Sequence, residues 1–444
     1  MNNWKPIILG DFIEVLTDYH ANGAYNKLKE NIELKHEEDY AIMIRTLNLE
    51  ANNFDDRLIY LNEKEYNFLS KSKVYYGDII MNKIANPGTV YLMPKLNKPV
   101  SLAMNLFLIR FKNTINPKFI FHLMKMNEDY IKRFANGTTT KSITKDAVRG
   151  LKFKVPDLLS QNKIAKVLSD LDAKIEVNNK INKELEAMAK TLYDYWFVQF
   201  DFPDENGKPY KSSGGKMVYN EVLKRKIPEG WEVKELQDII EIERGISYKS
   251  SEIKGGGIPM INLNSFNLDG TYKETGIKMF SGKKSEKKMA KPGDLLIAVT
   301  DVTRDAHIIG KSILVPDYYD ELVYSMDIAK IIPKNRLTKT YLKMLFNSDH
   351  YHNYIKWFAS GTIVLHLNMD GMKWYNTEIP PKHLIDQYDD IYKNVENRIS
   401  STTKQNQKLA QLRDWLLPML MNGQVSVGEE EQLGLVADGR GEYN

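Results

Sequence analysis

Residues 135–143, which read ANGTTTKSI, combine glycine, threonine, lysine and serine in the order of a phosphate-binding loop. A nucleotide-binding loop reads G-x-x-x-x-G-K-[ST], and its second glycine stands directly before the lysine so that backbone N–H groups surround a phosphate. Here Thr140 holds that place, and Lys141 and Ser142 follow it. The segment therefore predicts either an altered nucleotide site or a loop that meets phosphate in another way.

The second half of the chain repeats the first, and this repeat bears on the choice. FANGTTTKSITKDAVRGLKFKVP (134–156) aligns with FASGTIVLHLNMDGMKWYNTEIP (358–380) at a constant offset of 224 residues. YYGDIIMN (75–82) aligns with KPGDLLIA (291–298). An internal repeat means one structural unit used twice. The second copy has no lysine or serine in the loop, so we expect a loop kept for its shape and no ATP site.

Other strings that could carry catalysis or a metal are better explained as turns and linkers. An adenine methyltransferase would carry [DNS]-P-P-[YF], whereas the nearest string here is NPGT at 86–89. PDENGK (203–208) resembles part of a nuclease motif but lies in a polar segment without a strand to carry it. His350, His352 and His366 could supply metal ligands, but His350 and His352 have no counterpart in the first copy. We expect no catalytic residue and no metal site.

The composition is that of a globular protein with two or three domains. The chain has 444 residues, 42% hydrophobic and 27% charged, and its lack of cysteine excludes disulfides and thiolate zinc sites. The net charge is +4, and because the last twenty residues carry −4, the remainder carries +8. This mild excess permits a polyanionic partner without requiring one. No apolar run would span a membrane and the first residues lack the plan of a signal peptide, so we expect a cytoplasmic protein.

Each copy begins with short β-rich runs broken by turns and ends with a long helical stretch. VYYGDIIMNKI and DLLIAVT are apolar and rich in strand-forming residues, while NPG, GGG and LDG indicate turns. This mixture predicts an α+β domain in each copy, followed by a helix.

Apolar residues in the helical stretches alternate at steps of four and three, which is the heptad seam of a coiled coil. Asn182 and Asn406 stand at matching steps, where a polar residue costs stability but fixes the register. Arg413 interrupts the second seam, and we expect its neighbour Leu412 to take the core position. The linker allows a reversal of direction, so the two helices are predicted to form an antiparallel coiled coil, although each stripe could instead dock on its own domain. The seam comprises Ile164, Leu168, Leu171, Ile175, Asn182, Leu185, Leu192, Trp196, Val395, Ile399, Asn406, Leu409, Leu416 and Leu420.

Two similar domains on a helical spacer suit the reading of two short sites a fixed distance apart. A helix over 164–196 would be about 50 Å long at about 1.5 Å per residue. On DNA this length is on the order of one and a half helical turns. Because the two domains are not identical, the two half-sites would differ.

The chain resembles the specificity (S) subunits of type I restriction–modification systems over essentially its whole length up to about residue 424. The resemblance rests chiefly on SQNKIAKVLSDLDAKIEVNNKINKELEAMAKTLYDYWFVQFDFP (160–203) and LRDWLLPMLMNGQV (412–425), with the paired GDII/GDLL and NGT/SGT elements. It implies a non-catalytic subunit that reads a bipartite, asymmetric double-stranded DNA target, one half with each target recognition domain.

The same resemblance implies the partners and where the cofactors are bound. The helices would dock modification subunits, usually two copies, and restriction subunits would complete the complex. S-adenosylmethionine, ATP and Mg²⁺ would be bound by these partners, and no cofactor by this chain. We accordingly divide the chain into target recognition domain 1 (1–158), a central helical spacer (159–200), a linker (201–226), target recognition domain 2 (227–382), a C-terminal helical spacer (383–424) and an acidic tail (425–444), which we expect to be disordered.

Two loops in each domain are predicted to contact DNA: the loop after the Gly-Asp strand and the Gly-Thr loop. Hydroxyl and backbone N–H groups hold phosphates, while Asn, Lys and Arg suit base edges. For each residue the alternative of an ordinary turn residue stays open. The candidates are Asn82, Lys83, Asn86, Thr138, Thr139, Thr140 and Lys141 in the first copy, and Thr300, Thr303, Arg304, Ser360, Thr362 and His366 in the second.

A scaffold with two protein-interaction domains on a helical spacer, without DNA binding, would also explain the duplication. DNA binding that weakens steeply with salt would separate the two hypotheses, because each neutralised phosphate releases counterions.

Overall fold

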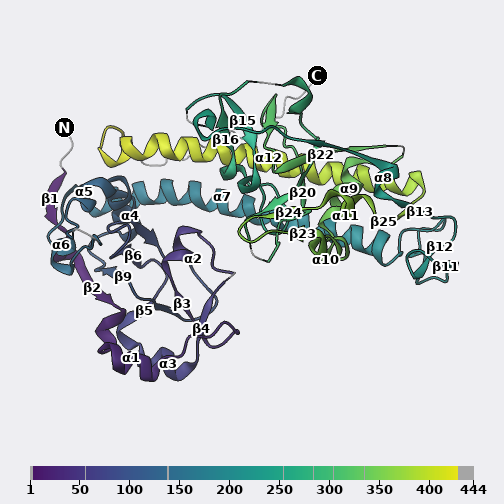
Figure 1. The fold of residues 1–444 in the computed structure, drawn as a ribbon. Coiled ribbons are helices and arrows are strands. Elements are labelled where there is room, and N and C mark those ends of the chain that lie inside the picture. The colour runs from purple at the N-terminus through teal and green to yellow at the C-terminus, as the bar shows by residue number, and fades with distance from the viewer. Residues whose placement is uncertain are drawn as a thin grey trace, which may run out of the picture. The chain divides into compact units, whose positions relative to one another are not determined.

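The structure is a computed structural model that describes residues 4–428 except 56, 138, 139, 254, 284, 304 and 335. The chain divides into two compact units: the first combines the residues up to Ile175 with those from Lys408 onward, and the second is Glu176–Gln407. Two long helices, α7 (Leu158–Tyr193) and α12 (Lys382–Met421), each contribute to both units (Figure 1). Among the described residues, no helix is both long and apolar enough to cross a membrane.

Two four-stranded sheets form the framework of the first domain. Residues of β6 (Ile79–Asn82) alternate between two hydrophobic cores, with Ile79 and Met81 in one and Ile80 in the other, because successive side chains of a strand point to opposite faces. This explains the continuous apolar run in the sequence. The sheets have the orders β2 (Ile13–Asp18)-β9 (Leu106–Phe111)-β6 (Ile79–Asn82)-β7 (Val90–Leu92) and β4 (Ile59–Leu61)-β3 (Ala41–Ile44)-β8 (Val100–Leu102)-β5 (Lys73–Val74).

The second domain repeats this framework strand for strand. The parallel pair β3–β8 of the first domain is matched by the parallel pair β15 (Ile258–Ile261) and β21 (Leu322–Tyr324). All other pairs within these sheets are antiparallel. The predicted α+β repeat is therefore confirmed. The sheets have the orders β14 (Ile240–Arg244)-β22 (Ile328–Pro333)-β18 (Leu295–Ala298)-β20 (Ser312–Leu314) and β16 (Lys278–Phe280)-β15 (Ile258–Ile261)-β21 (Leu322–Tyr324)-β17 (Met289–Ala290).

Smaller elements complete each domain. A short antiparallel pair precedes each long helix, β1 (Lys5–Ile8) with β10 (Lys152–Val155) and β13 (Glu232–Glu235) with β25 (Asn376–Ile379). The second domain also contains the sheet β19 (Thr300–Asp301)-β24 (Leu365–Leu367)-β23 (Ala359–Ser360). The linker before it contributes the hairpin β11 (Met217–Asn220)-β12 (Arg225–Pro228). The shorter helices are α1 (Tyr25–Asn31), α2 (Thr46–Glu50), α3 (Glu63–Phe68), α4 (Pro117–Met126), α5 (Glu128–Lys132), α6 (Lys145–Arg149), α8 (Leu236–Ile239), α9 (Lys339–Asn347), α10 (Asp349–Ile355) and α11 (Met369–Lys373).

Within the second unit, α7 and α12 run antiparallel, as predicted. Asn178 Nδ2 donates to Asn406 Oδ1 at 2.8 Å, and farther along α7 the carbonyl of Ala189 accepts from the hydroxyl of Tyr388 at 3.0 Å. The partner on α12 thus moves backward as the residue on α7 moves forward. Tyr388 also belongs to the main hydrophobic core of this unit. The helical stripes therefore both pair with each other and pack on the domain.

The polar contacts at the centre of this pairing are related by a pseudo-two-fold exchange. The repeat matches Asn178 with Thr402 and Asn182 with Asn406, so the Asn178–Asn406 contact has its counterpart in the contact between Thr402 and Asn182. Asn406 Nδ2 donates to Asn179 Oδ1 at 2.9 Å, and the equivalent bond runs from Asn182 Nδ2 to Thr403 Oγ1 at 3.2 Å. Each contact in one half of the layer therefore has an equivalent contact in the other half. Such a contact is self-complementary, like an isologous interface.

In the first unit the expectation for Leu412 is wrong. Leu412 is 43% exposed, whereas Arg413 donates from Nη1 to Asp172 Oδ1 of α7 at 2.7 Å. A long arginine side chain packs its methylenes along an apolar seam and still brings its charged end to a carboxylate. The seam is therefore interrupted by an ion pair without a shift to the neighbouring residue. Ile164, Leu168 and Leu420 are buried in the first unit and Trp196 in the second, and the other predicted apolar seam residues are half-buried.

Candidate nucleic-acid interface

The two loops predicted to contact DNA lie side by side in each domain. In the first domain, Ser142 of the Gly-Thr loop forms β-bridges with Ile84, just beyond β6, and with Asn136. In the second domain, the matching residue His366 pairs with Thr300 of β19 and with Ser360 of β23. The same three positions therefore meet in both copies, although their residue types differ.

Glycine is required at the turn of each Gly-Thr loop. Gly137 has φ +125° and Gly361 has φ +143°, a backbone region that residues with a Cβ rarely adopt. A Cβ on Gly137 would lie 2.4 Å from the carbonyl oxygen of Thr140, and one on Gly361 would lie 2.0 Å from that of Val364. These contacts explain why the two copies share the glycine and why the shared feature is the shape of the loop.

Two of the predicted contact residues are buried, so the structure does not present them to a ligand. Asn82 is 0% exposed, and its Nδ2 donates to the hydroxyl of Tyr91 at 3.3 Å. Thr300 is 2% exposed, and its hydroxyl donates to Asp327 Oδ1 at 3.0 Å. Asn82 is the last residue of β6, and Thr300 begins β19, two residues after β18 ends. Both faces of β6 and β18 are covered by hydrophobic cores, which a sequence pattern that marks the end of a strand does not reveal.

Lys83 is half-buried in an internal ion pair. Its Nζ lies 3.1 Å from Asp18 Oδ2, and Lys145 Nζ lies 3.3 Å from Asp18 Oδ1. Burial alone would raise the pKa of Asp18, but the two ammonium groups outweigh it and hold that pKa below its usual value. Lys83 therefore anchors the loop after β6, and its availability for DNA depends on this bond.

The other described candidates lie on the surface or near it. Thr303 is half-buried, and the exposed candidates are Asn86, Thr140, Lys141, Ser360, Thr362 and His366. Thr138, Thr139 and Arg304 lie outside the described residues. The two adjacent loops thus form one polar surface in each domain. Hydroxyl, amide, imidazole and ammonium groups of this kind can bind phosphate oxygens and base edges.

Asp301 organises the loop of the second domain and was not among the predicted residues. It is 0% exposed, and its carboxylate accepts backbone N–H bonds from Thr303 at 2.6 Å, Ile308 at 2.7 Å and Ile309 at 3.1 Å. An aspartate at the end of a strand, two residues before a threonine, is a signal for such a side-chain turn. This carboxylate fixes the path of the segment that carries Thr303.

The aspartates of the Gly-Asp motif have a structural role. Asp78 accepts from the backbone N–H of Tyr75 and pairs with Arg110, whose Nη2 lies 2.6 Å from Asp78 Oδ2. Asp294 likewise accepts from the backbone N–H of Lys291 and pairs with Lys339 at 2.7 Å. The motif therefore closes the turn before β6 and β18 and positions the strand that leads to each loop.

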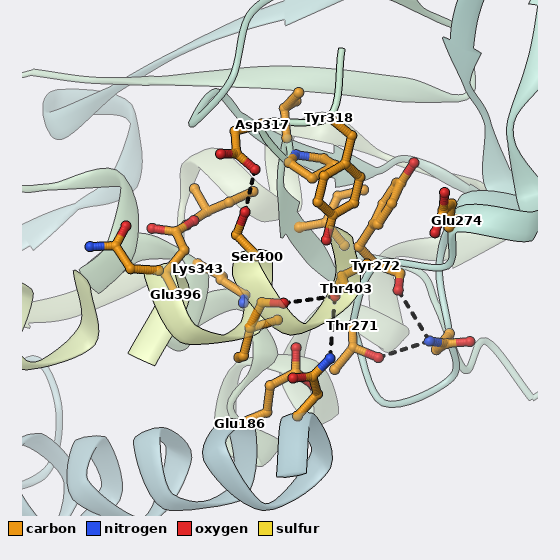
Figure 2. A pocket seen from close by; sticks show the side chains of 18 of the residues that line it. Glu186, Thr271, Tyr272, Glu274, Asp317, Tyr318, Lys343, Glu396, Ser400 and Thr403 are labelled. Atoms are coloured by element: carbon orange, nitrogen blue, oxygen red, sulfur yellow. Dashed lines mark hydrogen bonds between the residues drawn. The ribbon is translucent and has the colours of Figure 1, made fainter. Parts of the chain in front are cut away.

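A cavity of about 550 Å³ in the second unit contains none of the residues predicted to contact DNA (Figure 2). Glu186 of α7, Lys343 of α9 and Glu396 of α12 line it, and burial raises the pKa of both glutamates. Lys343 Nζ lies 2.6 Å from the hydroxyl of Tyr392. Burial alone would lower the pKa of Lys343, but Tyr392 and Glu186 raise it above its usual value. This charged group joins both long helices to the domain.

The comparisons with known proteins point to one family. The sequence profile described as "Type I restriction modification DNA specificity domain" matches residues 1–187 and 228–411. The HindI specificity subunit of Haemophilus influenzae, a type I restriction enzyme component, is 24% identical over 96% of this chain and 100% of that protein. The MjaIX specificity subunit of Methanocaldococcus jannaschii is 26% identical over 72% of this chain and 71% of that protein.

A solved structure supports the same fold. The S subunit of a type I restriction–modification system from M. genitalium superimposes with a TM-score of 0.52 at 15% identity, and the alignment covers 94% of this chain and 96% of that one. At this identity the likeness concerns the fold.

Proposed function

Because the chain belongs to the type I restriction–modification DNA specificity family, we propose that it is the DNA-reading subunit of a type I restriction–modification complex. Each target recognition domain reads one half of a bipartite, asymmetric target. The observation that carries this proposal is the repeated pairing of two loops, Ile84–Ser142–Asn136 in one domain and Thr300–His366–Ser360 in the other. One framework with different loop residues is what two different half-sites require.

The chain acts without chemistry of its own, and its partners supply the reactions. Modification subunits, in two copies, dock on the paired helices and use S-adenosylmethionine to methylate adenine. Restriction subunits use ATP and Mg²⁺ to translocate and cut unmodified DNA. The antiparallel pairing of α7 and α12 in the second unit supports this role of the helices, because it gives docking subunits a defined platform.

A methylation map tests the proposal. The chain is expressed with its modification subunit in a host free of DNA methylation, and methyladenine is located by single-molecule sequencing. We expect a bipartite asymmetric motif with an unspecified spacer. Exchanging residues 1–158 for those of another family member should change one half of the motif only.

The opposite outcome favours a protein scaffold. If the subunits co-purify and bind the methyl donor but no methylation appears, and if the complex shows no salt-dependent binding to any DNA, the DNA-reading role is wrong.

A further inference from the structure

Two large apolar side chains stand almost fully in solvent beside the Gly-Thr turn of the second domain. Trp357 is 88% exposed and Ile363 is 84% exposed, more than any other large hydrophobic side chain that the structure describes. Val302, next to the same sheet, is 60% exposed. Single exposed apolar residues are ordinary, but a group of them on one small element marks a binding surface.

The fold brings these three residues to one three-stranded sheet. Trp357 lies in the helical turn Lys356–Phe358 directly before β23, Ile363 lies between β23 and β24, and Val302 directly follows β19. The order of this sheet is β19-β24-β23. Because a Cβ on Gly361 would collide with the carbonyl of Val364, the turn that carries Ile363 is tight. Ile363 is thus presented to solvent by a constrained turn.

The first domain has polar residues at the matching positions. The repeat offsets match Trp357 with Arg133 and Val302 with Asn86, both exposed, and match Ile363 with Thr139, which lies outside the described residues. Both domains have the glycine-dependent turn, so the fold does not demand exposed apolar side chains there. Their presence in the second domain alone points to a ligand contact that the first domain does not make.

We propose that Trp357 and Ile363, which lie on either side of β23, form an apolar surface, the wedge, that contacts the bases of the half-site read by the second domain, and that one side chain of this wedge inserts at a single step and unstacks it. This inference rests on the proposed function. Proteins that deform DNA insert apolar side chains between bases, and aromatic rings stack on exposed bases. DNA is favoured over a protein partner because the wedge is continuous with the predicted polar contacts Thr362 and His366. Lys356, next to Trp357, adds a cation suited to a phosphate.

The wedge means that the two half-sites are read by different physical interactions. The second half-site is read partly through the cost of unstacking one step, which is lowest at flexible pyrimidine–purine steps. The first half-site is read without the wedge, because the first domain has Arg133 and Asn86 at the positions of Trp357 and Val302.

The test uses the complex of the full chain with its modification subunits and a 40-base-pair duplex that carries the motif from the methylation map. 2-Aminopurine replaces, one duplex at a time, each adenine on either strand of the second half-site and its flanking steps, other than the methylated adenine. With the wild-type complex we expect fluorescence to rise severalfold at one step. The W357A/I363A variant should abolish this rise and bind the duplex about tenfold more weakly. W357F should keep most of both effects.

Tyr219 supplies the matched control, because it is an aromatic residue of the same unit that is 55% exposed on the β11–β12 hairpin. Y219A should behave as the wild type. The proposal is overturned if the W357A/I363A complex unstacks and binds the duplex as the wild type does. It is also overturned if the W357A/I363A chain no longer binds its modification subunits but, measured without them, keeps its affinity for DNA. The wedge would then be a protein-docking surface. If the wild-type complex itself binds no DNA sequence specifically, the proposed function fails first.

Discussion

In the first domain the loop after β6 is anchored by Asp18, whose carboxylate binds the ammonium groups of Lys83 and Lys145. In the second domain the loop after β18 is anchored by Asp301, whose carboxylate binds backbone N–H groups. Strand pairing places Arg244 where the first domain has Asp18, and the repeat places Ala85 where the second has Asp301. The framework is common to both domains, but the charged groups that hold each loop differ in position and in partner. Duplication thus preserved the strand order and left the loops free to diverge.

The largest effect is expected from Asp301→Ala, which gives the second domain the alanine of the first. Three backbone N–H groups lose a buried charged acceptor, so the free energy of unfolding should fall by about 3 kcal/mol. Hydrogen exchange in residues 302–309 should accelerate strongly. Asp305→Ala, which removes a carboxylate that is 80% exposed in the same loop, is the matched control and should change little. Equal effects of the two variants would show that Asp301 does not anchor the loop.

A smaller loss is expected from Asp18→Asn in the first domain, because its lysine partners are partly solvated and regain water. Urea unfolding should show a loss of about 1–1.5 kcal/mol at pH 7. The folded-state pKa of Asp18 is depressed, so its stabilisation is present above the unfolded-state pKa of about 3.9 and disappears as pH falls through the folded-state value. The gap between wild type and variant should therefore close in acid. A gap that stays constant down to pH 3 would contradict the ion-pair explanation.

Asp389 of α12 stands where the first copy has the buried Ala165, and its substitution should stabilise the protein. Burial raises the pKa of Asp389 to about 6. Since the unfolded-state value is about 3.9, the folded protein favours the protonated form and loses stability as pH rises from about 4 to 6. Asp389→Asn keeps a partner for the hydroxyl of Thr338, which lies 2.9 Å from Asp389 Oδ1, without this loss.

Thermal unfolding at several pH values checks this prediction. The variant should match the wild type near pH 4 and exceed it by about 1 kcal/mol above pH 7. An advantage that is largest at pH 4 would reverse the sign and show that the carboxylate is stabilised in its charged form.

The smallest effects concern the seam at residues 412 and 413, where the first copy has Met188 and Ala189. Arg413→Ala should cost about 0.5–1 kcal/mol because it removes a partly exposed ion pair with Asp172 and its packing. Leu412→Ala should cost less than about 0.5 kcal/mol because that side chain faces solvent. Denaturant titration of both variants measures the two losses in the free energy of unfolding. A larger loss for Leu412→Ala than for Arg413→Ala would show that Leu412 occupies the core position.

The repeat and the heptad spacing were sufficient to predict the α+β domains and the antiparallel helices, because both depend on periodic patterns that survive divergence. Individual contacts were harder to predict. The end of β6 predicts a loop at Asn82 but does not show that a second core covers that side chain. Asp301 was missed because its three donors are supplied by a loop whose path depends on Asp301 itself. Leu412 was preferred over Arg413 on hydrophobicity alone, which ignores the reach of an arginine toward a carboxylate on the facing helix.

The exchange symmetry of the polar layer shows what kind of interface the helix pair forms. Asn178 and Asn179 meet Asn406 in the same way that their counterparts Thr402 and Thr403 meet Asn182. A contact of this form needs only one kind of helix and can be made by two separate, identical chains. The helix pair therefore has the form of a homodimer interface, with both partners supplied by one chain. Because both partners stand in one chain, each copy has its own sequence and can hold a different preference.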